Sequence, residues 1–268
     1  MIRYKMKITV FLKIAVKAVL PYGIMVLHRR NKVKKLTKRN TENYCPICKN
    51  MSNFEPFGNP TRLKARCPHC GAFERHRLLW LFWEKKTTLF DNTQKKILHI
   101  AAEPCFVRRL KDVFNDNYPN YLTADLYNPS AMVKMDITNI HYSDESFDVI
   151  ICNHVLEHVS DDLKAMKELY RILNKNGWAI LLVPTDNIEK TYEDFSITTE
   201  SGRLKAFGQH DHVRKYGRDY IDRLKFSGFN VTVFKKDEFA SIDEIKRMCL
   251  NDGNSLWWQP TEIFYCTK

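Results

Sequence analysis

The first 40 residues of this 268-residue chain contain no aspartate or glutamate, although they hold twelve lysines and arginines. The formal charge of +12 belongs to this segment, because the rest of the chain carries 31 basic and 31 acidic side chains. RNA-binding surfaces usually show a basic stripe, and the balanced charge after residue 40 argues against one there. Hydrophobic residues make up 44% of the chain, which excludes global disorder.

The N-terminal segment also lacks an uninterrupted apolar run suited to crossing a membrane. Residues 8–27 are mostly apolar, but Lys13 and Lys17 lie among them on one helical stripe, and Pro21 follows. No small-residue cleavage site precedes the next basic run, which argues against a signal peptide. We predict that residues 1–40 form an amphipathic helix on an anionic membrane, at its cytoplasmic inner face. The alternative is a helix packed on the protein's own surface.

The eight cysteines lack the pattern of a disulfide framework, which favours a reducing, cytosolic compartment. Four of them form two Cys-x-x-Cys pairs separated by 18 residues. Two such pairs can close a tetrahedral shell around Zn²⁺ and leave no open coordination position, which predicts a structural site. The predicted ligands are Cys45, Cys48, Cys67 and Cys70. The alternative is a set of unrelated redox motifs or buried thiols.

These patterns divide the chain into three predicted parts. They are a membrane-associating segment over residues 1–40, a zinc ribbon over 41–77 and a larger domain over 78–268. The ribbon holds only about 30 residues, too few for a core of their own, so the metal is expected to fold it.

A helix is predicted to bridge the ribbon to the larger domain. The aliphatic and aromatic run from Leu78 to Trp83 indicates this helix. Arg75, His76 and Arg77 precede the run and could bind an anionic substrate. We expect them instead to lie on a solvated or salt-bridged helix face.

From about residue 95, short apolar runs alternate with helical patterns, which indicates parallel strands joined by crossover helices. The predicted strands are 96–101, 121–125, 133–137, 147–153, 178–183 and 261–266. An amphipathic helix is predicted over Asp161–Leu173, and we expect Asn176-Gly177 to end it.

The segment from Asp136 to Pro184 resembles the class I S-adenosylmethionine-dependent methyltransferases, in the branch similar to small-molecule and sugar methyltransferases. The resemblance is carried by Asp136-Ile137-Thr138, Ser146-Phe147-Asp148, His154-Val-Leu-Glu157-His158-Val159, Leu173-Asn-Lys-Asn-Gly177 and Ile180-Leu-Leu-Val-Pro184. It implies an α/β fold with a seven-stranded Rossmann-like sheet, helices on both faces and an antiparallel last strand. In this chain a zinc ribbon and an N-terminal amphipathic helix would precede the sheet. The cofactor is implied to lie at the carboxyl ends of the early strands.

The resemblance also implies which residues contact the S-adenosylmethionine. Asp125, with Leu126 beside it, is expected to accept both ribose hydroxyls. Asp136 and Ile137 are expected to hold the adenine. Asn153 and His154 are expected to flank the methionine end.

The first cofactor loop, Ala101-Ala102-Glu103, departs from the family because it lacks the usual glycines. Glycine permits close backbone approach, so its absence narrows the room beside the cofactor. Glu103 could still face the methionine ammonium. The altered loop leaves open a non-catalytic adaptor with a degenerate methyltransferase fold.

The densest polar cluster spans residues 208–217, after the fifth strand, where the family places substrate-facing loops. A histidine there could remove a hydroxyl proton while an aspartate orients its ring, and an arginine could clamp a phosphate or carboxylate. The predicted catalytic residues are His158, His210, Asp211 and His212, and the predicted substrate-binding residues are Arg214 and Tyr216. The alternative is a helix start capped by Asp211, with merely exposed histidines.

His154-x-x-Glu157-His158 raises the possibility of a second divalent metal. Certain O-methyltransferases acting on catechols and RNA 3′ ends use Glu-x-x-Glu-His and a distant histidine as ligands. Here His154 replaces the first glutamate, and His210 or His212 could complete the set. We favour the alternative, in which the segment shapes the site without a metal.

Together these features predict O-methylation of a sugar or other small hydroxyl acceptor, including a lipid-linked precursor of a surface glycan. An RNA methyltransferase is the alternative enzyme, because a four-cysteine ribbon before such a domain also resembles certain ribosomal RNA enzymes. Its basic patch would comprise Arg62, Lys64, Arg66, Arg75 and Arg77. The neutral charge after residue 40 makes nucleic acid the less expected partner.

Overall fold

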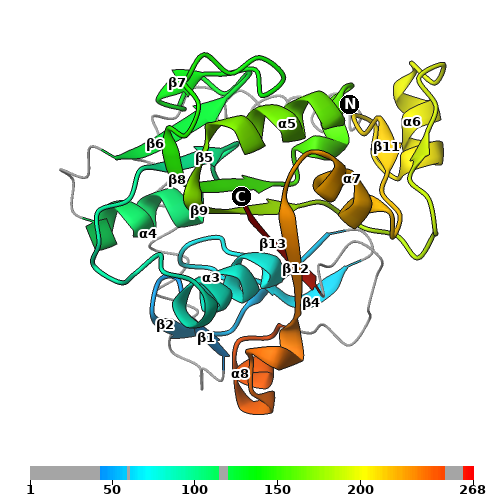
Figure 1. Cartoon of the computed structure of the whole chain (residues 1–268). Helices are drawn as coiled ribbons and strands as arrows, with labels where there is room; N and C mark the ends of the chain where they lie inside the picture. The colour runs from blue at the N-terminus through cyan, green and yellow to red at the C-terminus, as the bar shows by residue number, and fades with distance from the viewer. Residues whose placement is uncertain (1–42, 59–60, 115–119, 251–261) are drawn as a thin grey trace, which may run out of the picture.

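The computed structural model describes residues 43–58, 61–114, 120–250 and 262–268, so the predicted membrane-associating segment 1–40 lies outside the described residues. In these ranges the chain forms a seven-stranded sheet flanked by helices, with a small cysteine-containing module beside it (Figure 1). None of the described helices is both long enough and apolar enough to cross a membrane.

The sheet has the strand order β12-β13-β9-β8-β5-β6-β7. The strands are β5 (Ile97–Ile100), β6 (Tyr121–Asp125), β7 (Val133–Lys134), β8 (Phe147–Asn153), β9 (Leu173–Leu182), β12 (Asn230–Lys235) and β13 (Glu262–Thr267). The pairs from β7 to β9 are parallel, whereas β13 runs antiparallel to both β9 and β12. This topology confirms the predicted Rossmann-like methyltransferase sheet. The sequence patterns had not located β12.

The central strands form where the sequence is continuously apolar. All four residues of β5 are buried, and so are six of the seven in β8. A strand covered by helices on both faces needs this pattern, whereas a half-exposed strand alternates. The apolar runs therefore located these parallel strands closely.

The helix before β9 ends earlier than predicted. The helix α5 (Asp162–Ile172) is capped by Asp161, whose carboxylate accepts the Lys164 N–H at 2.9 Å. Leu173 already has extended backbone and begins β9, so the prediction that Asn176-Gly177 ends the helix is wrong. A Cβ added at Gly177 would lie 2.8 Å from the Asp148 carbonyl oxygen, so this glycine permits close packing within the sheet.

Helices cover both faces of the sheet, as predicted (Figure 1). The helices are α3 (Glu74–Lys86), α4 (Pro104–Phe114), α5, α6 (Glu200–Phe207), α7 (Tyr220–Phe226) and α8 (Ile242–Arg247), with 3₁₀ turns η1 (Leu156–His158) and η2 (Lys236–Glu238). Phe82 of α3 packs on Tyr265, while Tyr220 of α7 packs on the neighbouring Phe264. Successive side chains of a strand point to opposite faces, so α3 and α7 lie on different sides of β13.

The cysteine module consists of two hairpins and their Cys-x-x-Cys turns. The hairpins are β1 (Asn43–Cys45) with β2 (Asn50–Ser52), and β3 (Glu55–Phe57) with β4 (Arg62–Arg66). The helix α3 follows the second turn directly, so the predicted boundary between residues 77 and 78 falls inside a helix. On another side, α8 packs on β1, with the Arg247 guanidinium 4.7 Å from the Tyr44 ring. The module therefore shares packing with the larger domain.

Arg77 is fully buried at this junction. Its Nη1 donates to the carbonyl oxygens of Ala65 and Ala72, at 3.0 and 2.9 Å. Its Nε and Nη2 donate to the carbonyl oxygens of Met248 and Cys249, at 2.7 and 3.1 Å. The expected solvated or salt-bridged helix face is therefore wrong for Arg77, because four carbonyl oxygens replace its water.

Replacing Arg77 by methionine should lower the free energy of unfolding by about 3–5 kcal/mol, because several buried carbonyl groups would lose their donors. The measurement is urea denaturation of the zinc-loaded protein. Arg66→Met is the control, since Arg66 is partly exposed and its ion pair with Glu55 spans 3.7 Å. That change should cost less than about 1 kcal/mol. Similar losses in the two variants would contradict a structural role specific to Arg77.

Candidate functional site

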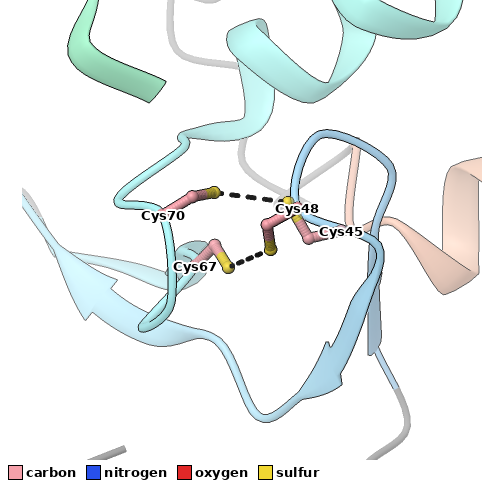
Figure 2. A group of neighbouring side chains, drawn as sticks. All are labelled: Cys45, Cys48, Cys67 and Cys70. Atoms are coloured by element: carbon pink, nitrogen blue, oxygen red, sulfur yellow. Dashed lines mark hydrogen bonds between the residues drawn. The ribbon is translucent and has the colours of Figure 1, made fainter. Parts of the chain in front are cut away.

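The four predicted zinc ligands lie together, with their sulfurs turned toward one another (Figure 2). The Sγ atoms of Cys45 and Cys70 are 3.6 Å apart, those of Cys48 and Cys67 are 3.7 Å apart, and all four lie within 4.8 Å of one another. Tetrahedral Zn–S bonds of about 2.3 Å place sulfurs about 3.8 Å apart. The arrangement therefore fits a zinc ion.

The thiol chemistry of the cluster also suits a cation. Hydrogen bonds among the four thiols raise the pKa of Cys45 and Cys70 and lower that of Cys48 and Cys67. Zinc binds cysteine as the thiolate, so all four thiols would lose their protons when the ion binds. Gly71 has φ +79° and donates its N–H to the Cys67 carbonyl oxygen at 2.9 Å, which closes the second turn.

Cys67→Ser should abolish the binding of one zinc ion per chain, because a tetrahedral shell would lose one of its four thiolates. Zinc content is measured by atomic emission on protein purified with zinc. Cys249→Ser is the control, because this buried thiol is outside the cluster, and it should retain one zinc per chain. Full zinc content in Cys67→Ser would rule out the predicted ligand set.

The predicted cofactor residues lie at the carboxyl ends of neighbouring parallel strands. Ala101, Ala102 and Glu103 follow β5, and Asp136 and Ile137 come after β7. Asp125 ends β6 and Leu126 follows it, while Asn153 ends β8 and His154 follows it. Parallel strands bring these ends to one edge of the sheet, where ligands bind in open α/β folds.

Two residues at this edge have backbone conformations that favour glycine. Ala101 has φ 48° and His154 has φ 54°, both in the left-handed region. Ala101 therefore supplies the turn that glycine makes easily, and its N–H donates to the Ala124 carbonyl oxygen at 2.8 Å. Strained backbone of this kind gathers at functional sites.

Glu103 is the central charge of the first loop, with its side chain 14% exposed. One carboxylate oxygen lies 2.8 Å from Nε2 of His99, and the other accepts the Asn153 side-chain N–H at 3.2 Å. Burial opposes ionisation, but the His99 hydrogen bond and nearby imidazoles lower the pKa of Glu103 to about 2. The loop thus holds a buried carboxylate, which suits a ligand ammonium.

His99 is a site residue that the sequence predictions missed. It is fully buried in β5, with Nδ1 2.8 Å from the Tyr121 hydroxyl and Nε2 on Glu103. The signal was a histidine inside an otherwise apolar strand, since a buried polar ring needs partners on both nitrogens. His99 holds the Glu103 carboxylate in place.

The two aspartates differ from Glu103 in being more accessible. One oxygen of the partly exposed Asp125 accepts the backbone N–H groups of Tyr127 and Asn128, both at 2.8 Å. The other carboxylate oxygen of Asp125 takes no part in these two contacts, so it is free to accept a ribose hydroxyl. Asp136 is exposed, and hydrogen bonds from Thr138 lower its pKa.

The structure brings three of the four predicted catalytic residues together. Nδ1 of His158 lies 3.3 Å from the Asp211 carbonyl oxygen and 3.4 Å from its carboxylate. The His158 and His212 rings are perpendicular, with centroids 4.8 Å apart. His210 is exposed outside this cluster.

The same cluster includes three groups that could hold a divalent cation. Glu157, His158 and His212 each offer a ligand atom, and these atoms lie within 4.8 Å of one another. Oε2 of Glu157 is buried and has no hydrogen-bond partner among the described residues. His154, the other residue proposed for this metal, has Nδ1 3.3 Å from Oε1 of Glu157.

Arg214 has structural contacts in place of the predicted contact with substrate. Its side chain is 1% exposed and donates to the Glu193 carboxylate at 2.5 Å. It also donates to the carbonyl oxygens of Leu156, Val159 and Ser160. With its donors used inside the protein, Arg214 does not present a face to a substrate anion.

Tyr216 is also structural. It is fully buried, and its hydroxyl donates to the Asp162 carboxylate at 2.7 Å. Arg223 donates to the same carboxylate at 2.6 Å, so Tyr216 belongs to a buried network between α5 and α7.

Sequence comparisons agree with this geometry. Residues 96–181 match the family model described as "Methyltransferase domain", over about a third of the chain. An uncharacterized protein of Methanocaldococcus jannaschii is 36% identical over 75 residues, 27% of this chain and 33% of that protein. The chain thus matches only about a third of the relative's length. The methyltransferase match therefore covers the parallel strands from β5 to β9 of the seven-stranded sheet.

Several solved structures are similar in fold alone. A chain of the complex containing the Haloferax volcanii Trm112 methyltransferase activator has TM-score 0.47 and 12% identity, with 72% of this chain and 90% of that chain covered. The [4+2]-cyclase SpnF has TM-score 0.45 and 12% identity, with 74% of this chain and 83% of that chain covered. An S-adenosylmethionine dependent methyltransferase from Mesorhizobium loti has TM-score 0.43 and 15% identity, with 65% of this chain and 91% of that chain covered.

Ala101→Gly should leave the free energy of unfolding unchanged or raise it by up to about 1 kcal/mol, because relief of left-handed strain matches or outweighs the added freedom of the unfolded chain. Ala101→Val should cost about 1–3 kcal/mol, because a β-branched residue fits φ 48° poorly. Ala102→Gly, without positive φ to relieve, should cost about 0.5–1 kcal/mol. Urea denaturation measures all three. Equal costs for the two glycine variants would contradict the strained turn.

Proposed function

We propose that the protein is an S-adenosylmethionine-dependent O-methyltransferase that acts on a sugar or other small hydroxyl acceptor. The observation that carries the proposal is the placement of the His158–Asp211 pair next to the β8 end that bears Asn153. The Val213 N–H donates to the Glu157 carbonyl oxygen at 2.9 Å, which ties the segment bearing Asp211 to η1. An acid–base group therefore adjoins the proposed cofactor edge.

Bound S-adenosylmethionine supplies an electrophilic methyl group. Glu103, Asn153 and Asp125 would hold the cofactor. The Glu103 carboxylate and the unpartnered Oδ1 of Asn153 fit its ammonium, and the second carboxylate oxygen of Asp125 fits its ribose hydroxyls. This matching donor and acceptor set, together with the glycine-like turn at Ala101, fits the cofactor.

His158 acts as the base for the acceptor hydroxyl. Its Nδ1 hydrogen is shared by the carbonyl and carboxylate oxygens of Asp211, so the lone pair of the neutral ring is on Nε2. The His158 side chain is 34% exposed, which leaves it accessible to an acceptor. General base catalysis lowers the barrier when a hydroxyl must lose its proton during attack.

The zinc ion is structural in this proposal. Four cysteines saturate it, so it takes no part in the chemistry and stabilises the module that begins α3. We also keep the proposal that residues 1–40 hold the enzyme on the cytoplasmic face of an anionic membrane, where lipid-linked glycan precursors are available. Internal use of Arg214 favours a hydroxyl over an anionic group as the recognised feature.

A metal-assisted O-methylation is the second candidate mechanism. Its support is the triad of Glu157, His158 and His212, together with the unpartnered Oε2 of Glu157. A divalent cation there would lower the pKa of the acceptor hydroxyl directly. Under this mechanism all three ligands are required, whereas the base mechanism requires His158 and Asp211.

The first experiment is calorimetric titration of the zinc-loaded protein with S-adenosylmethionine, followed by transfer of a tritiated methyl group to monosaccharides and nucleotide sugars. His158→Asn should bind the cofactor as the unmodified protein does, but transfer methyl roughly 10²- to 10⁴-fold more slowly, because the base is lost. His141→Asn is the control, since this exposed histidine precedes β8. It should leave both measurements unchanged.

The outcomes separate the alternatives. If the unmodified protein does not bind S-adenosylmethionine, the proposed enzyme is excluded. Methyl transfer to RNA but to no sugar would show that the acceptor is RNA and not a sugar. A loss in Glu157→Gln as large as in His158→Asn, with transfer dependent on added divalent metal, would favour the metal-assisted mechanism.

A further inference from the structure

The first turn of α3 lies against the loop that follows β5. Nδ1 of His76 is 3.4 Å from Sγ of Cys105, 29 residues further along the chain. The His76 and Phe106 ring centroids are 5.3 Å apart. The helix that leaves the cysteine module therefore begins beside the proposed cofactor edge.

This turn presents hydrogen-bond donors that the protein does not use. Nδ1 of His76 accepts the Phe73 N–H at 3.2 Å, so the ring hydrogen is on Nε2. Burial lowers the pKa of His76 to about 3, so the ring stays neutral. Nε2 of His76 and Nε of Arg75 are buried and have no hydrogen-bond partner among the described residues. Buried donors of this kind usually have a partner in the functional state.

Two acceptor groups lie close by. Oε1 of Glu103 is 3.8 Å from Nε2 of His76 and accepts the Asn153 amide at 3.2 Å. Oδ1 of Asn153 is buried with no partner in the described part of the chain. The edge thus combines unused donors on α3 with the Glu103 carboxylate after β5 and the unpartnered Oδ1 of Asn153 at the end of β8.

Arg75 and Glu103 carry opposite charges that are close but not directly paired. Arg75 is within electrostatic range of Glu103, yet the described residues give it no ion pair shorter than 4.0 Å. The Arg75 residue is partly exposed, with its guanidinium carbon 5.3 Å from the Phe73 ring centroid. A ligand with one charge of each sign would satisfy both side chains.

We propose that Arg75 binds the carboxylate of the amino-acid end of S-adenosylmethionine, opposite Glu103, which binds its ammonium. This inference rests on the proposed function. The planar guanidinium matches a carboxylate, and Nε2 of His76 can donate to the same group. The helix α3 begins four residues after Cys70, so the zinc-binding module supplies a cofactor-binding residue.

The test compares two nucleosides by calorimetry on the full zinc-loaded chain. S-adenosylhomocysteine carries the amino-acid end, and 5′-methylthioadenosine lacks it. Arg75→Met should weaken binding of S-adenosylhomocysteine roughly tenfold to a hundredfold, the range for a charged hydrogen bond, and change that of 5′-methylthioadenosine less than about twofold. Arg108→Met, an exposed residue of α4, is the matched control and should change neither.

Retained binding of 5′-methylthioadenosine also establishes that Arg75→Met is folded. Equal weakening of both nucleosides, or no weakening of either, overturns the assignment of Arg75 while leaving the proposed function standing. If the unmodified protein binds neither nucleoside, the proposed function fails, and the assignment of Arg75 fails with it.

Discussion

The buried guanidinium of Arg77 is the interaction on which the junction between cysteine module and sheet depends. A guanidinium cannot lose its charge in a protein, so burial requires acceptors around it. Four carbonyl oxygens, from the module and from the segment after α8, meet this requirement. Their positions fix the start of α3, and with it the distance from His76 to Glu103. A module too small to have its own core is thereby built into the catalytic domain.

The loop after β5 makes the turn that glycine favours, although its residues are Ala101, Ala102 and Glu103. Ala101 has a left-handed backbone conformation although it is not a glycine. The buried His99 holds the Glu103 carboxylate just after the end of β5. The Glu103 carboxylate is stable after the strand because hydrogen bonds and nearby imidazoles compensate its burial. The altered loop therefore does not by itself indicate a degenerate fold. The loop gives the site the buried negative charge of Glu103. In our proposal, Arg75 in the first turn of α3 supplies the positive charge.

The polar residues after β9 fall into two groups, those that lie together beside His158 and those whose contacts are inside the protein. His158, Asp211 and His212 converge, whereas Arg214 is used inside the protein although it is only two residues from His212. Sequence spacing predicted that this segment was important, but Arg214 begins a short strand (Arg214–Lys215), whereas Asp211 and His212 precede it. Which of them face solvent depends on Asp162, Glu193 and the carbonyl groups of η1, which lie elsewhere in the chain.

The sequence by itself determined the central parallel strands, because a continuous apolar run indicates burial on both faces whatever the neighbouring strands are. It also determined the four cysteines that meet, since their spacing is a local property. Only the tertiary structure decided that Arg77 is a core residue and that Arg75 lies within electrostatic range of Glu103. The partners of Arg77 include carbonyl groups 171 and 172 residues away, and no local pattern reports such a contact. Periodicity tells which residues are buried, whereas the partner that makes a buried charge tolerable is set by the fold.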